Sequence, residues 1–114
     1  MLQIKDSNVT VMVNDMDKAI QFYESIGLVL KQRWENYYAM IKAGDLTIGL
    51  HPSNGGATGS GAASIGFMID KIEDGKAILD KANIAYKQEN GGSGHYLNFQ
   101  DPWGTHLYFV QPGW

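Results

Sequence analysis

The chain opens with an alternation of hydrophobic and polar positions that then changes to a helical spacing. Over residues 8–13 every second residue is valine, which predicts a strand with one buried face. Beyond it the apolar side chains recur every three or four residues, which predicts an amphipathic helix. Its apolar stripe consists of Met16, Ile20, Tyr23 and Ile26. Asn14 or Asp15 can cap the start of this helix, and Gly27 can end it in the left-handed conformation.

Three more strands are expected after the helix, over residues 28–34, 37–43 and 46–51, because these segments are rich in branched and aromatic residues. The dipeptides between them are short enough to be hairpin connections. Residues 52–62 are rich in glycine and serine, which predicts a linker without regular structure.

The order of elements then repeats. A strand is predicted over residues 63–69, and Asp70 and Glu73 have the spacing of a capping box at the start of a second helix. Asn83 can end that helix, and we expect a short strand over residues 84–88. A glycine-rich loop and a final pair of strands complete the unit. The repetition predicts two modules in one domain spanning residues 1–114, with module one at 7–51, the linker at 52–62 and module two at 63–112.

The final pair of strands spans residues 96–110 around the sequence Asp-Pro-Trp-Gly at 101–104. Aspartate, proline and glycine occupy the positions that each prefers in a type I turn. Because side chains alternate across a strand, Leu107 and Phe109 share one face, and His106 and Tyr108 share the other. The second face is polar and aromatic but uncharged, which suits the wall of a cavity.

Composition narrows the classes of function. A net charge of -3 with scattered lysine and arginine offers no basic patch for nucleic acid and no cationic face for a membrane. The absence of cysteine excludes disulfides, thiolate metal sites and cysteine nucleophiles. Because neither a signal peptide nor an apolar stretch of membrane-spanning length is visible, we expect a cytoplasmic protein.

Three stretches together carry a resemblance to a known family: residues 9–23 (VTVMVNDMDKAIQFY), residues 26–28 (IGL), and the DPWG turn at residues 101–104. With the twofold repeat, they make the chain similar to the vicinal oxygen chelate superfamily, from about residue 7 to residue 111. That group includes glyoxalase I, extradiol dioxygenases, fosfomycin-resistance proteins and bleomycin-resistance proteins. The resemblance implies an α+β fold with two paired βαβββ modules, in which a cupped mixed sheet surrounds a cleft and the helices lie outside.

Enzymes of this superfamily hold a divalent metal with side chains at four places, typically histidine and glutamate. Matched motif by motif, these places fall at Asn8, Gly49, Ser64 and Tyr108. None of the four is a usual metal ligand, whereas a zinc or first-row metal site needs about three strong donors. We therefore expect no metal and no cofactor, and the residues favour a binding protein over an enzyme.

The leading hypothesis is a metal-independent protein of the bleomycin-resistance type that holds an aromatic or amphipathic small molecule in a cleft, for example to sequester a drug and confer antibiotic resistance. The expected ligand-binding residues are Asn8, Trp34, Tyr38, Gly49, His51, Ser64, Met68, His106 and Tyr108. The only partners expected are this ligand and a second copy of the chain in a homodimer, and neither nucleic acid nor a membrane.

The alternative is a lyase, an isomerase or a dioxygenase-like enzyme, either metal-free through Tyr108, His51 and His106 or with relocated metal ligands. A third reading, assembly without a dedicated ligand, also stays open. Along the chain, no base stands at a useful spacing from Ser64, so a serine nucleophile is not predicted.

Overall fold

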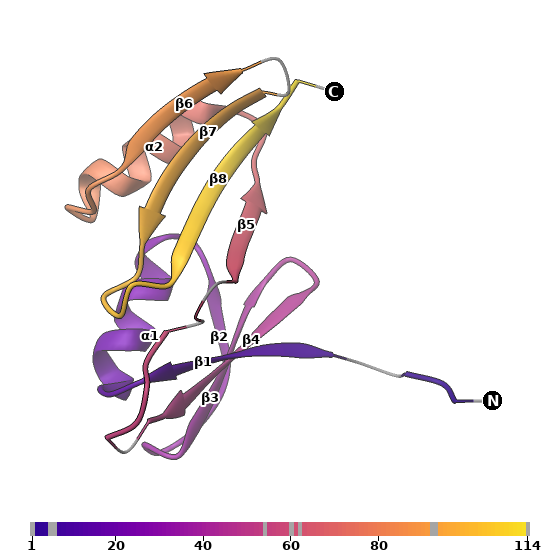
Figure 1. Ribbon diagram of the computed structural model, residues 1–114, viewed down its shortest axis with the longest axis vertical. Helices are drawn as coiled ribbons and strands as arrows, with labels where there is room; N and C mark the ends of the chain where they lie inside the picture. The colour runs from indigo at the N-terminus through magenta and orange to yellow at the C-terminus, as the bar shows by residue number, and fades with distance from the viewer. Residues whose placement is uncertain are drawn as a thin grey trace. The chain divides into compact units, whose positions relative to one another are not determined.

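The chain folds into two compact units, residues 1–58 and 59–114 (Figure 1). The computed structural model describes residues 2–4, 7–53, 55–59, 61, 63–91 and 94–113. The linker predicted over residues 52–62 lies partly outside this range, at residues 54, 60 and 62. In the part of the chain that the structure describes, no helix combines the length and the apolar character needed to span a bilayer.

The first unit is a four-stranded mixed sheet with one helix against it. Its elements are β1 (Asn8–Val13), α1 (Met16–Ser25), β2 (Val29–Trp34), β3 (Tyr38–Ala43) and β4 (Leu46–Pro52). The strand order is β1-β4-β3-β2, with β1 parallel to β4 and the other pairs antiparallel. The strands and the helix predicted from the sequence are confirmed here, apart from shifts of a residue at their ends.

Helix α1 lies against β2, β3 and β4 and covers one face of this sheet. The side chains on that face are almost inaccessible to solvent; they are Val11, Val13, Ala39, Ile41, Ile48 and Leu50. Asp15 caps the helix, because its Oδ1 accepts a hydrogen bond from the Lys18 amide at 3.0 Å. Gly27 follows the helix with φ of 105°, a conformation that strains any residue with a Cβ. Both ends of α1 are therefore as predicted.

The second unit repeats this architecture. Its elements are β5 (Ser64–Met68), α2 (Ile72–Lys81), β6 (Lys87–Gly91), β7 (Gly94–Gln100) and β8 (His106–Pro112). The strand order is β5-β8-β7-β6, with β5 parallel to β8, and α2 lies against β7 and β8. Leu107 and Phe109 are buried on the helix face, as their alternation predicts. The α+β class with two βαβββ modules is thus confirmed.

The turn between β7 and β8 has the predicted form. The Gly104 amide donates to the Asp101 carbonyl at 3.1 Å, which closes the turn. In addition, the Asp101 carboxylate accepts from the amides of Trp103 at 2.9 Å and Thr105 at 2.8 Å. Asp101 is only 4% exposed, so these bonds satisfy a buried charged group. They explain why an aspartate is needed at the start of this turn.

Two local predictions were wrong. Asp70 and Glu73 form no capping box, because Lys71 is the N-cap residue of α2 and its side chain makes no capping hydrogen bond. Instead, the Ile72 amide donates to Oε1 of Gln111, at 2.8 Å, from strand β8. The strand predicted over 84–88 begins only at residue 87, because the Ile84 amide bonds to the Leu79 carbonyl at 2.9 Å and continues the end of the helix.

Both ends of the predicted glycine-rich loop, residues 91–94, belong to strands. Gly91 and Gly94 pair with each other as the last residues of β6 and the first of β7. Residues 92 and 93, which complete this loop, lie outside the described residues.

Replacement of Gln111 by alanine should lower the free energy of unfolding by about 1 kcal/mol, because the first turn of α2 loses its side-chain acceptor. Urea denaturation monitored by circular dichroism measures the change. Asp70→Ala is the matched control and should stay within about 0.5 kcal/mol of the wild type, because Asp70 is an exposed residue outside the cap. A larger loss of unfolding free energy for Asp70→Ala than for Gln111→Ala would contradict this assignment and support the capping box.

Candidate functional site

The candidate residues of the first unit lie on the sheet face opposite α1. Trp34 pairs with Tyr38 across β2 and β3. Gly49 and His51 alternate with the buried Ile48 and Leu50 along β4. Side-chain alternation thus brings residues from three strands to one face. Asn8 is exposed at the start of β1, where it pairs with Thr47.

Three rings on this face form a continuous group, which we call the aromatic array: Trp34, Tyr38 and His51. The ring centroids of Trp34 and Tyr38 are 5.8 Å apart with an interplanar angle of 41°, and those of Tyr38 and His51 are 6.3 Å apart at 65°. Trp34 keeps 42% of its surface exposed. Nδ1 of His51 donates to the Pro52 carbonyl at 2.9 Å, so the neutral ring presents Nε2 as an acceptor. The array therefore offers aromatic surface and a polar atom together.

Gly49 explains how the array fits on the sheet. The hydroxyl end of the Tyr38 ring lies over Gly49, where a Cβ would collide with it. Gly49 has an ordinary backbone conformation, so its missing side chain, and not its flexibility, is what the position requires. The residue contributes no donor of its own and instead makes room for the tyrosine.

The candidate residues of the second unit lie on the face of its sheet opposite α2. Ser64 pairs with His106, and Gly66 pairs with Tyr108, across the parallel strands β5 and β8. The Tyr108 ring covers Gly66 in the same manner, and it stacks on His106 with centroids 6.0 Å apart at 30°. Met68, at the end of β5, is 66% exposed.

Ser64 contacts a histidine, which the spacing of residues along the chain did not indicate. Its Oγ lies 2.6 Å from Nδ1 of His106, and Nε2 of His106 lies 3.0 Å from Oδ1 of Asn98. The sequence spacing indicated no base for Ser64, and the structure places a histidine beside it because strand pairing joins residues that are 42 positions apart. Sequence reasoning also missed Asn98. The available signal was the hairpin itself, which places Asn98 opposite Tyr108.

The donor set does not fit a divalent metal ion. Of the four positions that correspond to metal ligands in the family, Gly49 has no side chain, the Ser64 hydroxyl is engaged by His106, and the Tyr108 ring packs on Gly66. Among the residues that the structure describes, no three histidine, aspartate or glutamate side chains gather as a metal site would require. A relocated metal site therefore has no support in this part of the chain.

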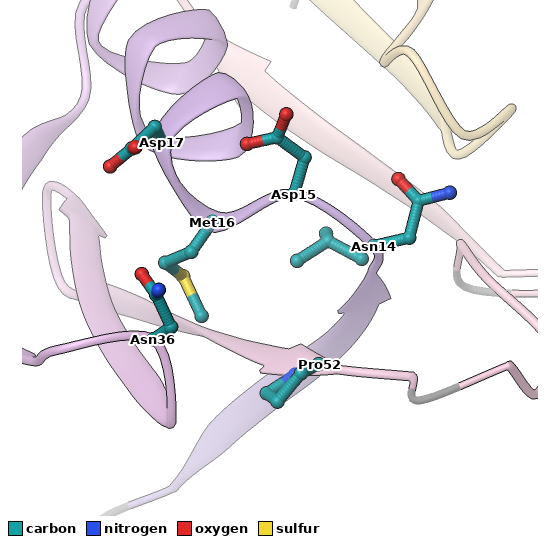
Figure 2. Close-up of a pocket in the computed structure, with 7 residues that line it drawn as sticks. Asn14, Asp15, Met16, Asp17, Asn36 and Pro52 are labelled. Atoms are coloured by element: carbon teal, nitrogen blue, oxygen red, sulfur yellow. The ribbon is translucent and has the colours of Figure 1, made fainter.

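A separate open pocket lies at the start of α1 (Figure 2). It is lined by Val13, Asn14, Asp15, Met16, Asp17, Asn36 and Pro52. Its two carboxylates already have partners, because Asp15 caps the helix and Asp17 forms an ion pair with Arg33 at 2.7 Å. The pocket contains none of the nine predicted ligand-binding residues, so we do not assign it a function.

Comparison with known proteins gives one family match. The model described as the Glyoxalase/Bleomycin resistance protein/Dioxygenase superfamily matches residues 7–109. No match was found among the curated proteins.

Solved structures share the fold at low sequence identity. A glyoxylase/bleomycin resistance protein/dioxygenase domain from Frankia sp. EAN1pec has a TM-score of 0.76 and 22% identity, over 96% of this chain and 92% of that one. The bleomycin resistance determinant encoded on transposon Tn5 has a TM-score of 0.76 and 19% identity, over 97% and 100%. The fosfomycin resistance protein FosX from Listeria monocytogenes has a TM-score of 0.80 and 15% identity, over 96% and 93%.

Replacement of Gly49 by alanine should lower the free energy of unfolding by about 1–3 kcal/mol, because the new methyl group meets the Tyr38 ring. In a Tyr38→Ala background the same replacement should cost less than about 0.5 kcal/mol. Urea denaturation of the four proteins in this double-mutant cycle measures the coupling. Equal costs of Gly49→Ala in both backgrounds would contradict the contact.

Proposed function

The chain belongs to the glyoxalase/bleomycin resistance protein/dioxygenase superfamily, and we propose that it binds a planar aromatic or amphipathic small molecule without the help of a metal ion. The aromatic array is the observation that carries this proposal. Trp34 and Tyr38 offer ring faces on the side of the sheet opposite α1, and His51 adds a hydrogen-bonding group beside them. Ligand sites commonly combine aromatic walls with a few polar atoms that orient the guest.

The chemistry of the four ligand positions supports the proposed metal independence. An aliphatic hydroxyl, an amide, a phenol and a bare glycine supply too few strong donors for a zinc or first-row metal ion. In this chain, Gly49 and Tyr108 instead take part in packing of a tyrosine ring on a glycine. The proposed binding uses stacking and hydrogen bonds in place of coordination.

The charge of the chain favours one kind of guest. A net charge of -3 attracts cations to the surface and disfavours anions. Aromatic faces such as that of Trp34 also attract a cation by about 0.5–1 kcal/mol at exposed positions. We therefore propose a ligand that is planar and neutral or cationic.

The proposal also includes the remaining predicted ligand-binding residues, the oligomeric state and the role of the binding. The other predicted residues, including Asn8 in the first unit and Met68 and Tyr108 in the second, are proposed to contact the ligand, and a homodimer is proposed as the assembly. Sequestration of a drug is the role that such binding would serve, by analogy with the resistance proteins among the similar structures.

The first test measures ligand binding, by a thermal-shift screen and then by calorimetry. Bleomycin, named with the similar Tn5 determinant, and ethidium, a planar aromatic cation, serve as probes for a thermal-shift screen. A probe at 100 times its dissociation constant should stabilise the fold by about 2.7 kcal/mol. Trp34→Ala should then weaken the binding of the active probe by up to about tenfold, measured by isothermal titration calorimetry, because stacking contributes about 0.5–1.5 kcal/mol.

Tyr37→Ala is the matched control for the aromatic array. Tyr37 precedes the array residue Tyr38 and is 72% exposed, so its removal should leave the affinity unchanged within about twofold. Equal affinity of the wild type and Trp34→Ala, or the absence of a shift with both probes, would contradict the proposal.

A second test addresses metal independence. Exhaustive dialysis against EDTA should leave the dissociation constant of the active probe unchanged within about twofold, because no donor set at the four positions holds a divalent ion. Addition of Zn²⁺ or Ni²⁺ to the dialysed protein should likewise have no effect. Loss of binding with EDTA and its return with either ion would overturn this part of the proposal.

A further inference from the structure

The second unit contains a row of three hydrogen-bonded side chains, two of which, Ser64 and His106, also belong to the nine residues proposed for ligand binding. Ser64 Oγ, the His106 ring and the Asn98 amide follow one another at 2.6 Å and 3.0 Å. Ser64 is exposed at the start of β5, whereas His106 and Asn98 are half-buried. The histidine and the asparagine are thus less exposed than the serine that carries the hydroxyl.

The hydrogen bonds determine which atom of the row is the base. The side-chain oxygen of Asn98 can only accept, so Nε2 of His106 carries the proton. In the neutral ring, Nδ1 is then the acceptor, and the Ser64 hydroxyl donates to it. This is the arrangement of an activated nucleophile, in which a base contacts the hydroxyl and a third group orients the base.

We propose that Ser64 is a nucleophile toward small carboxylic esters, with His106 as its general base and Asn98 as a positioning residue. This activity goes beyond the proposed binding function, and it uses residues of the second unit alone. The aromatic array of the first unit is not part of the reacting group.

The reaction balances as an acyl transfer followed by hydrolysis. The bond from Ser64 Oγ to the carbonyl carbon forms while the hydroxyl proton passes to Nδ1 of His106. The bond from that carbon to the alkoxy oxygen then breaks, and the departing alcohol takes the proton from Nδ1. Water then attacks the acyl-serine while it gives a proton to the same nitrogen. The bond from the acyl carbon to Ser64 Oγ breaks, Oγ takes that proton back, and the carboxylic acid is released.

Tyr108 is placed to assist at the developing oxyanion. Its hydroxyl end lies against Gly66, which is two residues from Ser64 on the same face of β5. The Cα atoms of residues two apart along a strand are separated by about 7 Å. A phenol donates a hydrogen bond, as stabilisation of the negative oxygen requires.

The first experiment uses p-nitrophenyl acetate with the full chain. Intact mass spectrometry and peptide mapping should locate one acetyl group on Ser64, and release of nitrophenol should show a burst. Ser64→Ala should abolish the burst, and His106→Gln should slow acylation by roughly 100-fold or more. The controls Ser25→Ala and His95→Gln should react like the wild type, because Ser25 lies in α1 and His95 contacts Asn90.

Asn98 is tested by rescue. Asn98→Leu should slow acylation by about tenfold, because His106 loses the acceptor that fixes its tautomer. Asn98→Asp keeps an acceptor and should restore the rate. Three outcomes would each overturn the assignment. They are acetylation of lysines or the N-terminus but not of Ser64, an unchanged rate in Ser64→Ala, and equal rates for Asn98→Leu and Asn98→Asp.

A second readout does not depend on ester turnover. Because the chain has no cysteine, Ser64→Cys introduces a single thiol. The pH dependence of its alkylation by iodoacetamide should give an apparent pKa clearly below the usual value of about 8.5, since protonated His106 stabilises the thiolate. Adding His106→Gln should return the pKa to the usual value, whereas adding His95→Gln should not. An unshifted thiol in Ser64→Cys would contradict the role of His106 as base.

Discussion

The burial of one face of each sheet beneath its own helix is the constraint on which the rest of the structure depends. Val11, Ile41 and Leu50 are fully buried on the helix side of the first sheet, and burial of each such side chain contributes about 1.5–3 kcal/mol. A slip of one residue in any strand would exchange this face for the other, so the register is firmly determined. The polar and aromatic residues between them are thereby held on the face opposite the helix.

This periodicity is why most of the fold could be predicted from the sequence. Alternating valines, a capped helix and the aspartate-proline turn are local patterns, and each determines its own element. One prediction failed because a distant group decides the outcome. The start of α2 depends on Gln111, which is 39 residues from Ile72, and no local pattern contains that contact. The predicted start of β6 was wrong for a local reason, because the Ile84 amide is bonded to the Leu79 carbonyl at the end of the helix.

For the candidate sites, alternation was enough to place His106 and Tyr108 on one face, but not to find their partners. The contact between Ser64 and His106 arises from the register of the parallel pair β5 and β8. The two residues are 42 positions apart along the chain. Asn98 enters through the neighbouring hairpin. Spacing along a sequence indicates local partners only, so a group assembled from three strands requires the structure.

The two units share one packing arrangement but differ in the side chains around it. A tyrosine ring lies on a glycine in both, but Tyr38 of β3 covers Gly49 of β4, whereas Tyr108 of β8 covers Gly66 of β5. Gly49 and Tyr108 stand where the family resemblance implies metal ligands, so each unit has aromatic packing in place of a donor. In the first unit the ring joins an aromatic array, and in the second it stacks beside a serine and its base. The proposed recognition and the proposed acyl transfer therefore rest on different residues of one repeated fold.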